Sequence, residues 1–334
     1  MRIGIVGGGS FGTALAKLLA DADHQVTLWF RNAALAKAVA EQRENQVYLP
    51  GFQLPETVGI THELEEAVSG QELLVAVTPS HVTREVMTQA RPYIKGTPYV
   101  VSASKGIEEG SLHRMSQVLV DVLGQGFAGR VAVLSGPSFA HEVAAGMPTA
   151  VTAAAVNRDT AETVQTVFRG PTFRVYSSTD LIGVELGGAV KNVIAIAAGV
   201  SDGLGLGHSS RAALITRGVA EIARLVIRMG GDPQTVSGLS GVGDMVLTCT
   251  GDLSRNRTVG LRIGRGERLQ EILESMTMVA EGVRNSLSVH ALARRLGVEM
   301  PITEQIRLML HEDKPAHQVV GDLMSRQAKP EFWT

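Results

Sequence analysis

Lys191 has the surroundings that point most directly to chemistry. It lies in residues 186–195, a stretch that is apolar around nearly the whole circumference of a helix, so we expect this helix to be buried. A lysine in such a place needs a partner or a lowered pKa, because an isolated charge is costly away from water. We therefore predict that Lys191 has a partner or a lowered pKa, and the alternative is a side chain that extends along the helix to reach water at its end.

Three further polar groups could take part in the same chemistry. Lys105 directly follows the predicted strand 99–103, and open α/β sheets bind ligands at the carboxyl ends of their strands. Asp244 and Thr248 are four residues apart and would share one face of a helix. Residues 254–257 read Ser-Arg-Asn-Arg and are predicted to form a short polar loop that suits a phosphate or carboxylate. A solvated lysine, a helix cap and an ordinary surface loop are the respective alternatives.

The N-terminus carries a second kind of motif. Residues 7–12 read Gly-Gly-Gly-Ser-Phe-Gly, follow an apolar strand and open an amphipathic helix, which is the context that the dinucleotide-binding G-x-G-x-x-G motif requires. Gly7 would allow the tight turn, Gly9 the approach of a pyrophosphate, and Gly12 the close packing of helix on strand. An anion would then lie at a helix N-terminus.

Arg31 bears on which dinucleotide binds. Binders strict for NAD place an acidic residue near the end of the second strand, whereas the sequence after Trp29 is Phe-Arg-Asn, with no acid. Arginine can pair with a 2′-phosphate, so we favour NADP and keep NAD as possible. The alternative is that Arg31 is simply solvated.

Alternating strands and helices in the first half must position these groups. Apolar strands are predicted at residues 2–7, 25–30, 73–77, 99–103, 131–134, 150–155 and 173–176, with helices at 11–20, 33–41, 80–90, 111–123 and 160–168. Beyond residue 179 the pattern is almost wholly helical, with helices predicted at 181–200, 210–229, 267–273, 283–296 and 301–310. The fold class is therefore α/β, with a Rossmann-like doubly wound sheet in domain 1–178 and a mostly α-helical domain 179–334.

Bulk properties exclude several functional classes. The net charge of −2 over 334 residues gives no broad field for nucleic acid or an anionic membrane. A single cysteine, Cys249, excludes an intramolecular disulfide, and the nine histidines show no metal-ligand spacing. We expect no metal, no nucleic acid and no membrane insertion. The N-terminus starts directly in a strand, so the expected location is the cytoplasm.

The chain resembles the bacterial NAD(P)-dependent sn-glycerol-3-phosphate dehydrogenases. The resemblance runs in order over nearly the whole chain and is carried by the segments 7–12, 45–50 (Asn-Gln-Val-Tyr-Leu-Pro), 104–106 (Ser-Lys-Gly), 134–140 (Leu-Ser-Gly-Pro-Ser-Phe-Ala), 186–192 (Leu-Gly-Gly-Ala-Val-Lys-Asn), 241–250, 254–256 and 279–282. It implies reversible reduction of dihydroxyacetone phosphate to sn-glycerol 3-phosphate for phospholipid synthesis, with NADP or NAD as cofactor, a phosphorylated triose as substrate, and a homodimer.

The same resemblance implies roles for individual residues. Lys191 is the catalytic acid and base, grouped with Lys105, Asp244 and Thr248. The implied substrate ligands are Lys105, Gly136, Ser138, Lys191, Asp244, Ser254, Arg255 and Asn256. The implied cofactor ligands are Ser10, Phe11, Arg31, Tyr48, Lys105, Ala140, Arg255, Val279 and Glu281, together with the glycine motif.

Two other functions remain open at this stage. A β-hydroxyacid or ketopantoate reductase would share the glycine motif and the helical second domain, but not the segments 134–140 and 254–256. A non-catalytic dinucleotide sensor would have no use for a buried Lys191 facing Asp244.

The charge state of Lys191 depends on opposing effects. Burial and the charge of Lys105 would favour neutral Lys191, whereas Asp244 would favour the charged form, and the sequence does not decide between them.

Overall fold

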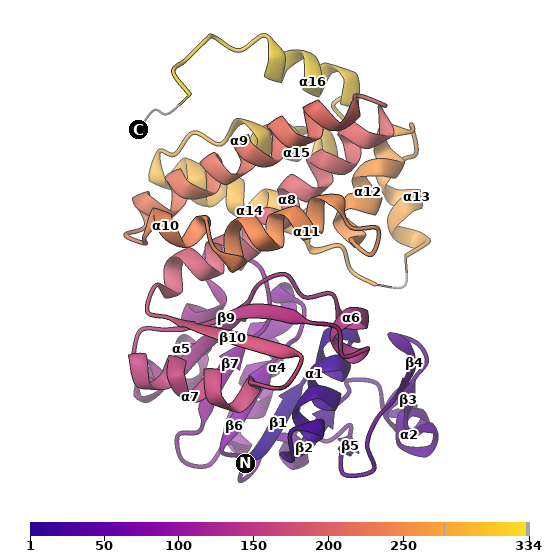
Figure 1. Ribbon diagram of the computed structural model, residues 1–334, viewed down its shortest axis with the longest axis vertical. Coiled ribbons are helices and arrows are strands. Elements are labelled where there is room, and N and C mark those ends of the chain that lie inside the picture. Colours follow the sequence, from indigo (N-terminus) through magenta and orange to yellow (C-terminus); the bar gives the residue numbers. More distant parts are fainter. Residues whose placement is uncertain (277, 332–334) are drawn as a thin grey trace. The chain divides into compact units, whose positions relative to one another are not determined.

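The computed structural model describes residues 1–276 and 278–331 (Figure 1). The chain divides into two compact units, each with its own hydrophobic core. The first comprises Met1–Lys105 and His113–Leu181, and the second comprises Gly106–Leu112 and Ile182–Thr334. The short segment Gly106–Leu112 thus packs with the later, helical part of the chain, although it precedes residue 178 in sequence.

An eight-stranded sheet forms the centre of the first unit, in the order β10-β9-β8-β7-β6-β1-β2-β5 (Figure 1). The strands are β1 (Arg2–Val6), β2 (Gln25–Trp29), β5 (Gly59–Thr61), β6 (Leu73–Ala76), β7 (Tyr99–Ser102), β8 (Val131–Ser135), β9 (Thr149–Ala155) and β10 (Phe173–Ser178). A separate hairpin pairs β3 (Glu44–Asn45) with β4 (Leu49–Gln53). The strands β3, β4 and β5 were not predicted from the sequence, because they are short and only partly apolar.

One pair of neighbouring strands departs from the parallel arrangement. All adjacent strands of the large sheet are parallel except β8 and β9, which run antiparallel with Leu134 opposite Ala153. Only the five-residue helix α6 (Ala140–Ala144) lies between them. A parallel connection usually needs a longer crossover, so the chain turns back instead.

Helices cover both faces of the sheet because its strands are buried on both sides. Along β6, Leu73 and Val75 belong to one apolar cluster, whereas Leu74 and Ala76 belong to another. The first cluster is completed by α1 (Ser10–Asp21), α2 (Ala33–Gln42), α6 and α7 (Arg158–Phe168). The second is completed by α3 (Leu64–Val68), α4 (Thr83–Ala90) and α5 (Met115–Leu123).

Helices joined by loops make up the described part of the second unit. Its helices are α8 (Leu181–Gly203), α9 (Gly207–Arg228), α10 (Pro233–Val236), α11 (Asp244–Thr250), α12 (Arg255–Gly264), α13 (Leu269–Glu274), α14 (Glu281–Leu296), α15 (Pro301–His311) and α16 (Ala316–Met324). A π-helical turn, Leu239–Gly243, leads into α11. Five were predicted nearly as observed, but α12 lies where a polar loop was expected.

Helix α8 forms the core of the helical unit. Its length and composition would allow it to cross a membrane, but 94% of its most apolar 18-residue stretch is buried inside the protein. Val190, Val193 and Ile194 are fully buried and belong to the central cluster of this unit. The predicted burial of the helix that carries Lys191 is therefore observed, and burial by protein accounts for its apolar surface.

Candidate active site

The side chain of Lys191 ends in a closed polar cluster. Its Nζ donates a 2.6 Å hydrogen bond to Oγ1 of Thr248 and lies 2.8 Å from Oδ1 of Asp244. Lys191 is 6% exposed, Asp244 1% and Thr248 4%. Asp244 and Thr248 stand one turn apart on α11, as their spacing predicted, and Thr248 Oγ1 lies 2.6 Å from the carbonyl oxygen of Asp244. The lysine thus has a charged partner instead of being isolated.

Two glycines allow α11 to approach Lys191. A Cβ on Gly187 of α8 would lie 2.6 Å from the Ser240 carbonyl oxygen, and a Cβ on Gly241 would lie 1.9 Å from that of Val236. Both distances are shorter than Cβ atoms show, so Gly187 permits the contact between α8 and the turn, and Gly241 permits the turn to fold closely on Val236. The turn that leads into α11 therefore packs directly on α8, which brings Asp244 to the lysine.

Residues 254–257 do not form the loop that the sequence suggested. Ser254 is the N-cap of α12 and its Oγ accepts a 3.2 Å hydrogen bond from the backbone N–H of Arg257. Arg255 and Asn256 occupy the first turn, where backbone N–H groups lack partners within the helix. The helix was not predicted because its residues are mostly polar. A helix N-terminus also suits an anion, so the anion-binding role of these residues stays a prediction.

The amide of Asn256 holds three helices together. Its Nδ2 donates a 3.0 Å hydrogen bond to Oδ1 of Asn192 on α8, and its Oδ1 accepts a 2.8 Å hydrogen bond from the N–H of Gly282 on α14. Asn192 directly follows Lys191 and was given no role from the sequence. A polar residue next to a buried lysine in an apolar helix is the signal that could have identified it.

Arg255, the first residue of α12, and Glu281, the first residue of α14, carry opposite charges that interact. Loss of hydration lowers the pKa of the Arg255 guanidinium, and the neighbouring Glu281 carboxylate raises it. Glu281 is the first residue of α14, and Val279, two residues earlier, is 43% exposed. The predicted residues of the helical unit therefore form two groups, one around Lys191 and one around the first turn of α12.

The glycine motif of the first unit has the geometry that a dinucleotide requires. Gly7 has φ +132°, and a Cβ on Gly12 would lie 1.9 Å from the Gly7 carbonyl oxygen, so neither position accepts a side chain. No protein atom lies within 4 Å of the place where a Cβ on Gly9 would be. The loop is thus closed against its own helix but open at Gly9, which fits a bound pyrophosphate.

A buried asparagine holds this loop in shape. Asn45 is fully buried, and its Nδ2 donates to the Gly8 carbonyl oxygen at 3.0 Å and to Thr13 Oγ1 at 2.8 Å. Its Oδ1 accepts from the Tyr48 N–H at 3.1 Å, and the Tyr48 carbonyl oxygen accepts a 2.6 Å hydrogen bond from Ser10. The structure therefore brings Tyr48 to the glycine motif and adds Asn45, which has no predicted role.

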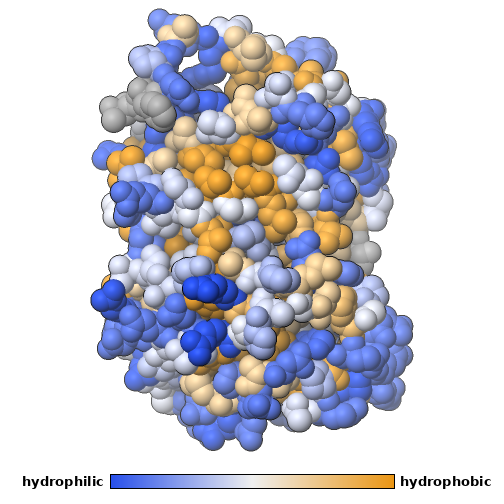
Figure 2. Space-filling view, in the orientation of Figure 1, coloured by the Kyte–Doolittle hydropathy of each residue, from blue (hydrophilic) through white to orange (hydrophobic). Residues whose placement is uncertain are grey.

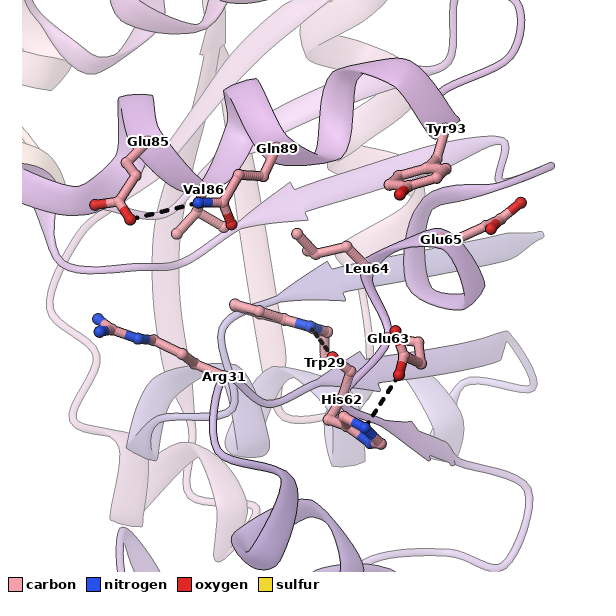
Figure 3. A pocket seen from close by; sticks show the side chains of 10 residues that line it. All are labelled: Trp29, Arg31, His62, Glu63, Leu64, Glu65, Glu85, Val86, Gln89 and Tyr93. Carbon is pink, nitrogen blue, oxygen red and sulfur yellow. Dashed lines mark hydrogen bonds and ion pairs between the residues drawn. The ribbon is translucent and has the colours of Figure 1, made fainter.

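Arg31 lines a pocket of about 430 Å³ beside the end of β2 (Figure 3). Trp29 and Val86 are buried, whereas Arg31 is exposed. The lining residues are Trp29, Arg31, His62, Glu63, Leu64, Glu65, Glu85, Val86, Gln89 and Tyr93. Three carboxylates share this pocket with the guanidinium, a balance of charge that weakens the expected preference for a 2′-phosphate.

Three of the remaining predicted residues of the first unit, Lys105, Gly136 and Ser138, meet where β7 and β8 end. Lys105 Nζ donates a 3.3 Å hydrogen bond to the Gly136 carbonyl oxygen, which also accepts a 3.0 Å hydrogen bond from Ser138. Gly136 has φ +149°, which only glycine adopts readily. Ala140 opens α6, and Phe11 packs against the apolar cluster of this unit.

Two family profiles together match most of the chain. The N-terminal profile of NAD-dependent glycerol-3-phosphate dehydrogenase matches residues 2–161, and the C-terminal profile matches residues 180–321. The chain belongs to the NAD-dependent glycerol-3-phosphate dehydrogenase family. This confirms the resemblance stated from the sequence and identifies the protein as a nicotinamide-dependent oxidoreductase of a family that uses NAD or NADP.

Individual relatives of this family match at high identity. A glycerol-3-phosphate dehydrogenase [NAD(P)+] from Geobacter sulfurreducens is 54% identical over 332 residues, which is 99% of each chain. One from Myxococcus xanthus is 52% identical over 332 residues, again 99% of each chain. A crystal structure of glycerol-3-phosphate dehydrogenase from Coxiella burnetii superposes with a TM-score of 0.93 at 42% identity, covering 97% of this chain and 99% of that one.

More distant structures share the fold alone. A ketopantoate reductase from Ralstonia eutropha gives a TM-score of 0.61 at 14% identity. The expected fold class, a Rossmann-like sheet followed by a helical domain, is confirmed. Membership of the glycerol-3-phosphate dehydrogenase family also implies a small phosphorylated triose as substrate.

Proposed function

We propose that this protein catalyses the reversible NAD(P)-dependent reduction of dihydroxyacetone phosphate to sn-glycerol 3-phosphate. The observation that carries the proposal is the buried pair of Lys191 and Asp244, whose Nζ and Oδ1 lie 2.8 Å apart. The chain is also similar, over nearly its full length, to enzymes named for this activity. A buried lysine with one carboxylate partner is a means of holding and releasing a proton at a defined place.

The dinucleotide is assigned to the first unit. Gly7, Gly9 and Gly12 shape the loop, and Asn45 holds it. When bound, the nicotinamide supplies or accepts the hydride. The further residues assigned to the cofactor are Ser10, Phe11, Arg31, Tyr48, Lys105, Ala140, Arg255, Val279 and Glu281. NADP and NAD are both accepted in this proposal, because Arg31 favours the 2′-phosphate while the carboxylates beside it oppose it.

Lys191 transfers the proton. In reduction, the ammonium polarises the C2 carbonyl of the substrate and gives one proton to its oxygen as the hydride reaches C2. In oxidation, neutral Lys191 takes the proton of the C2 hydroxyl. Asp244 and Thr248 hold Nζ in place, and the carboxylate stabilises the ammonium form at each return.

The first turn of α12 binds the phosphate of the substrate. Its N-terminal backbone N–H groups, the helix dipole and the Arg255 guanidinium all favour a dianion there. Ser254 and Asn256 complete this group, although in the structure the Ser254 hydroxyl caps the helix and the Asn256 amide joins helices. Lys105, Gly136 and Ser138 are assigned to the substrate from the first unit.

The quaternary state, location and pathway form part of the same proposal. We assign residues 1–178 to the dinucleotide-binding domain, except for Gly106–Leu112, which packs with the helical unit, and 179–334 to the helical domain. We propose a cytoplasmic homodimer that supplies glycerol 3-phosphate to phospholipid synthesis. Apolar side chains gather on the helical unit in Figure 2, and Leu206 and Ile227 at the two ends of α9 are 40% and 56% exposed. A gathering of apolar side chains on one face, as Figure 2 shows on this unit, supports an association between copies.

The experiment follows the absorbance of NADPH, and separately of NADH, with dihydroxyacetone phosphate as substrate. Oxidation of either cofactor at catalytic rates supports the proposal. Ketopantoate and β-keto acids serve as the controls, because a ketopantoate reductase shares this fold. Turnover of a keto acid with none of dihydroxyacetone phosphate would overturn the assignment.

A further inference from the structure

Helices α8 and α12 lie in backbone contact through two pairs of glycines. A Cβ on Gly199 or Gly203 of α8 would lie 2.1 or 2.4 Å from carbonyl oxygens of α12. A Cβ on Gly260 or Gly264 of α12 would lie 2.0 or 2.6 Å from carbonyl oxygens of α8. Because no side chains lie between the two backbones at these positions, a small rotation of one helix would displace the other. The helix that carries Lys191 and the helix that carries Arg255 are thus closely coupled.

A largely buried charge cluster joins the same two helices at the end of α8. Asp202 Oδ2 accepts hydrogen bonds from Nε and Nη2 of Arg257 at 3.0 and 2.9 Å. Both carboxylate oxygens also accept from Nη1 of Arg211 on α9, at 2.9 and 3.0 Å. The side chains of Asp202, Arg257 and Arg211 are 13%, 15% and 20% exposed, so water screens these bonds less than it does at the surface.

Arg257 lies in the first turn of α12, two residues after Arg255. Its own N–H donates to the N-cap Ser254, and its guanidinium also reaches Asp252 at 3.0 Å. The Asn256–Asn192 hydrogen bond fastens the same turn to α8 at a second point. Two fastenings at different points fix how α12 is rotated about its axis, and this rotation sets the direction of Arg255.

We propose that the Asp202–Arg257 pair is a positioning device for phosphate recognition, acting through the first turn of α12 and the direction of Arg255. The inference rests on the proposed function, because it takes the phosphate of the substrate as the ligand of that turn. Neither residue needs to touch the substrate. Arg211 supports the carboxylate from the other side and keeps Asp202 in place for Arg257.

The test compares Asp202→Asn, Arg257→Gln and Arg257→Lys with the matched control Arg262→Gln. Arg262 lies on the same helix and pairs with Glu267 at the surface, so its loss controls for a missing guanidinium on α12. The measured quantities are kcat, the KM for dihydroxyacetone phosphate and for NADPH, the Ki of inorganic phosphate as competitor, and Tm.

We expect the KM for dihydroxyacetone phosphate and the Ki of inorganic phosphate to rise together, by about tenfold, in Asp202→Asn and Arg257→Gln. The KM for NADPH stays unchanged, and kcat falls by less than KM rises. Arg257→Lys keeps the charge but not the two-point geometry and gives an intermediate KM. Arg262→Gln behaves as wild type.

A wild-type KM and a wild-type Ki in Arg257→Gln, whatever happens to Tm, would overturn the positioning role. Equal losses in Arg262→Gln would overturn it as well, because they would show that any charge on α12 has this effect. A wild-type enzyme that does not act on dihydroxyacetone phosphate would refute the proposed function itself. The two failures are therefore distinguishable.

Discussion

Lys191 and Asp244 form a buried ion pair, with Nζ 2.8 Å from Oδ1 and exposed fractions of 6% and 1%. The Asp244 carboxylate gives Lys191 a defined position. Because this carboxylate is buried, the stability of the folded protein also depends on the charge of Lys191. Removing one partner from a buried pair leaves the other without compensation and costs about 3–5 kcal/mol. A test of the lysine must therefore separate chemistry from stability.

Replacing Lys191 is expected to remove the proton transfer and leave the cofactor bound. Lys191→Ala should lower kcat by about 100-fold or more, since general acid–base catalysis contributes that much. Lys191→Arg keeps a charge opposite Asp244 but hardly gives up a proton, so it should fold better and be equally slow. Steady-state rates, NADPH fluorescence on binding and Tm measure the three properties. Substantial turnover by Lys191→Arg would exclude Lys191 as the proton donor.

The charge of Asp244 is expected to set the pH range of the oxidation reaction. A carboxylate beside an ammonium favours its charged form, so Asp244→Asn makes neutral Lys191 available at lower pH. The acid limb of kcat for sn-glycerol 3-phosphate oxidation should therefore move to lower pH. Glu274→Gln, at an exposed position on α13, is the control and should leave the profile in place. An unmoved limb in Asp244→Asn would mean that another group titrates.

The sequence predicted those parts of the site that depend on local pattern. The glycine motif at residues 7–12 needs only a strand before it and a helix after it, and both are visible in the apolar periodicity. The i, i+4 spacing of Asp244 and Thr248 likewise survives in α11. In these cases neighbours in sequence decide the geometry.

The parts that were missed depend on tertiary contacts. Helix α12 has few apolar residues and packs on α8 through the backbone contact of Gly260, which no local pattern reveals. Asn45 acts through a loop 37 residues away in sequence. The segment Gly106–Leu112 packs with the helical unit through Ile107 and Leu112, against its position in the chain. None of these can be inferred from periodicity.

Arg31 is expected to govern the choice between the two dinucleotides. Arg31→Asp places a fourth carboxylate in its pocket, which repels a 2′-phosphate and can bond the 2′-hydroxyl of NAD. The ratio of kcat/KM for NADPH to that for NADH should fall by about tenfold or more. Lys37→Asp makes the same charge change at an exposed site on α2 and serves as the control. Equal ratios in the two variants would remove Arg31 from this role.

Glu221 is expected to give the helical unit a pH-dependent stability. Its carboxylate is 1% exposed and accepts hydrogen bonds from the N–H groups of Ile302 and Thr303 at the start of α15. Burial raises the pKa of Glu221 to about 7, and these hydrogen bonds only partly oppose it. A folded pKa above the unfolded one means that the folded state binds the proton more tightly. The stabilisation is full below about pH 4 and is lost as the pH rises through 7.

The measurement is the free energy of unfolding in urea from pH 5 to pH 8. Glu221→Gln should flatten the pH dependence, by up to about 3 kcal/mol over this range, because the amide cannot ionise. Glu304→Gln, at an exposed position in the first turn of α15, is the matched control and should keep the wild-type slope. A Glu221→Gln slope equal to that of wild type would contradict the assignment.

Gly9 is expected to separate cofactor binding from folding. Its φ of −78° suits any residue, and no protein atom lies within 4 Å of the position of a Cβ there. A methyl group at that position therefore disturbs only what binds against the loop, so Gly9→Ala should keep the wild-type Tm and raise the KM for NADPH by about tenfold. Gly12→Ala places its Cβ 1.9 Å from the Gly7 carbonyl oxygen and should lower both Tm and cofactor affinity. Gly126→Ala, also in open space, controls for the added methyl group and should change neither. If Gly9→Ala bound NADPH as tightly as wild type, the dinucleotide would have to lie elsewhere.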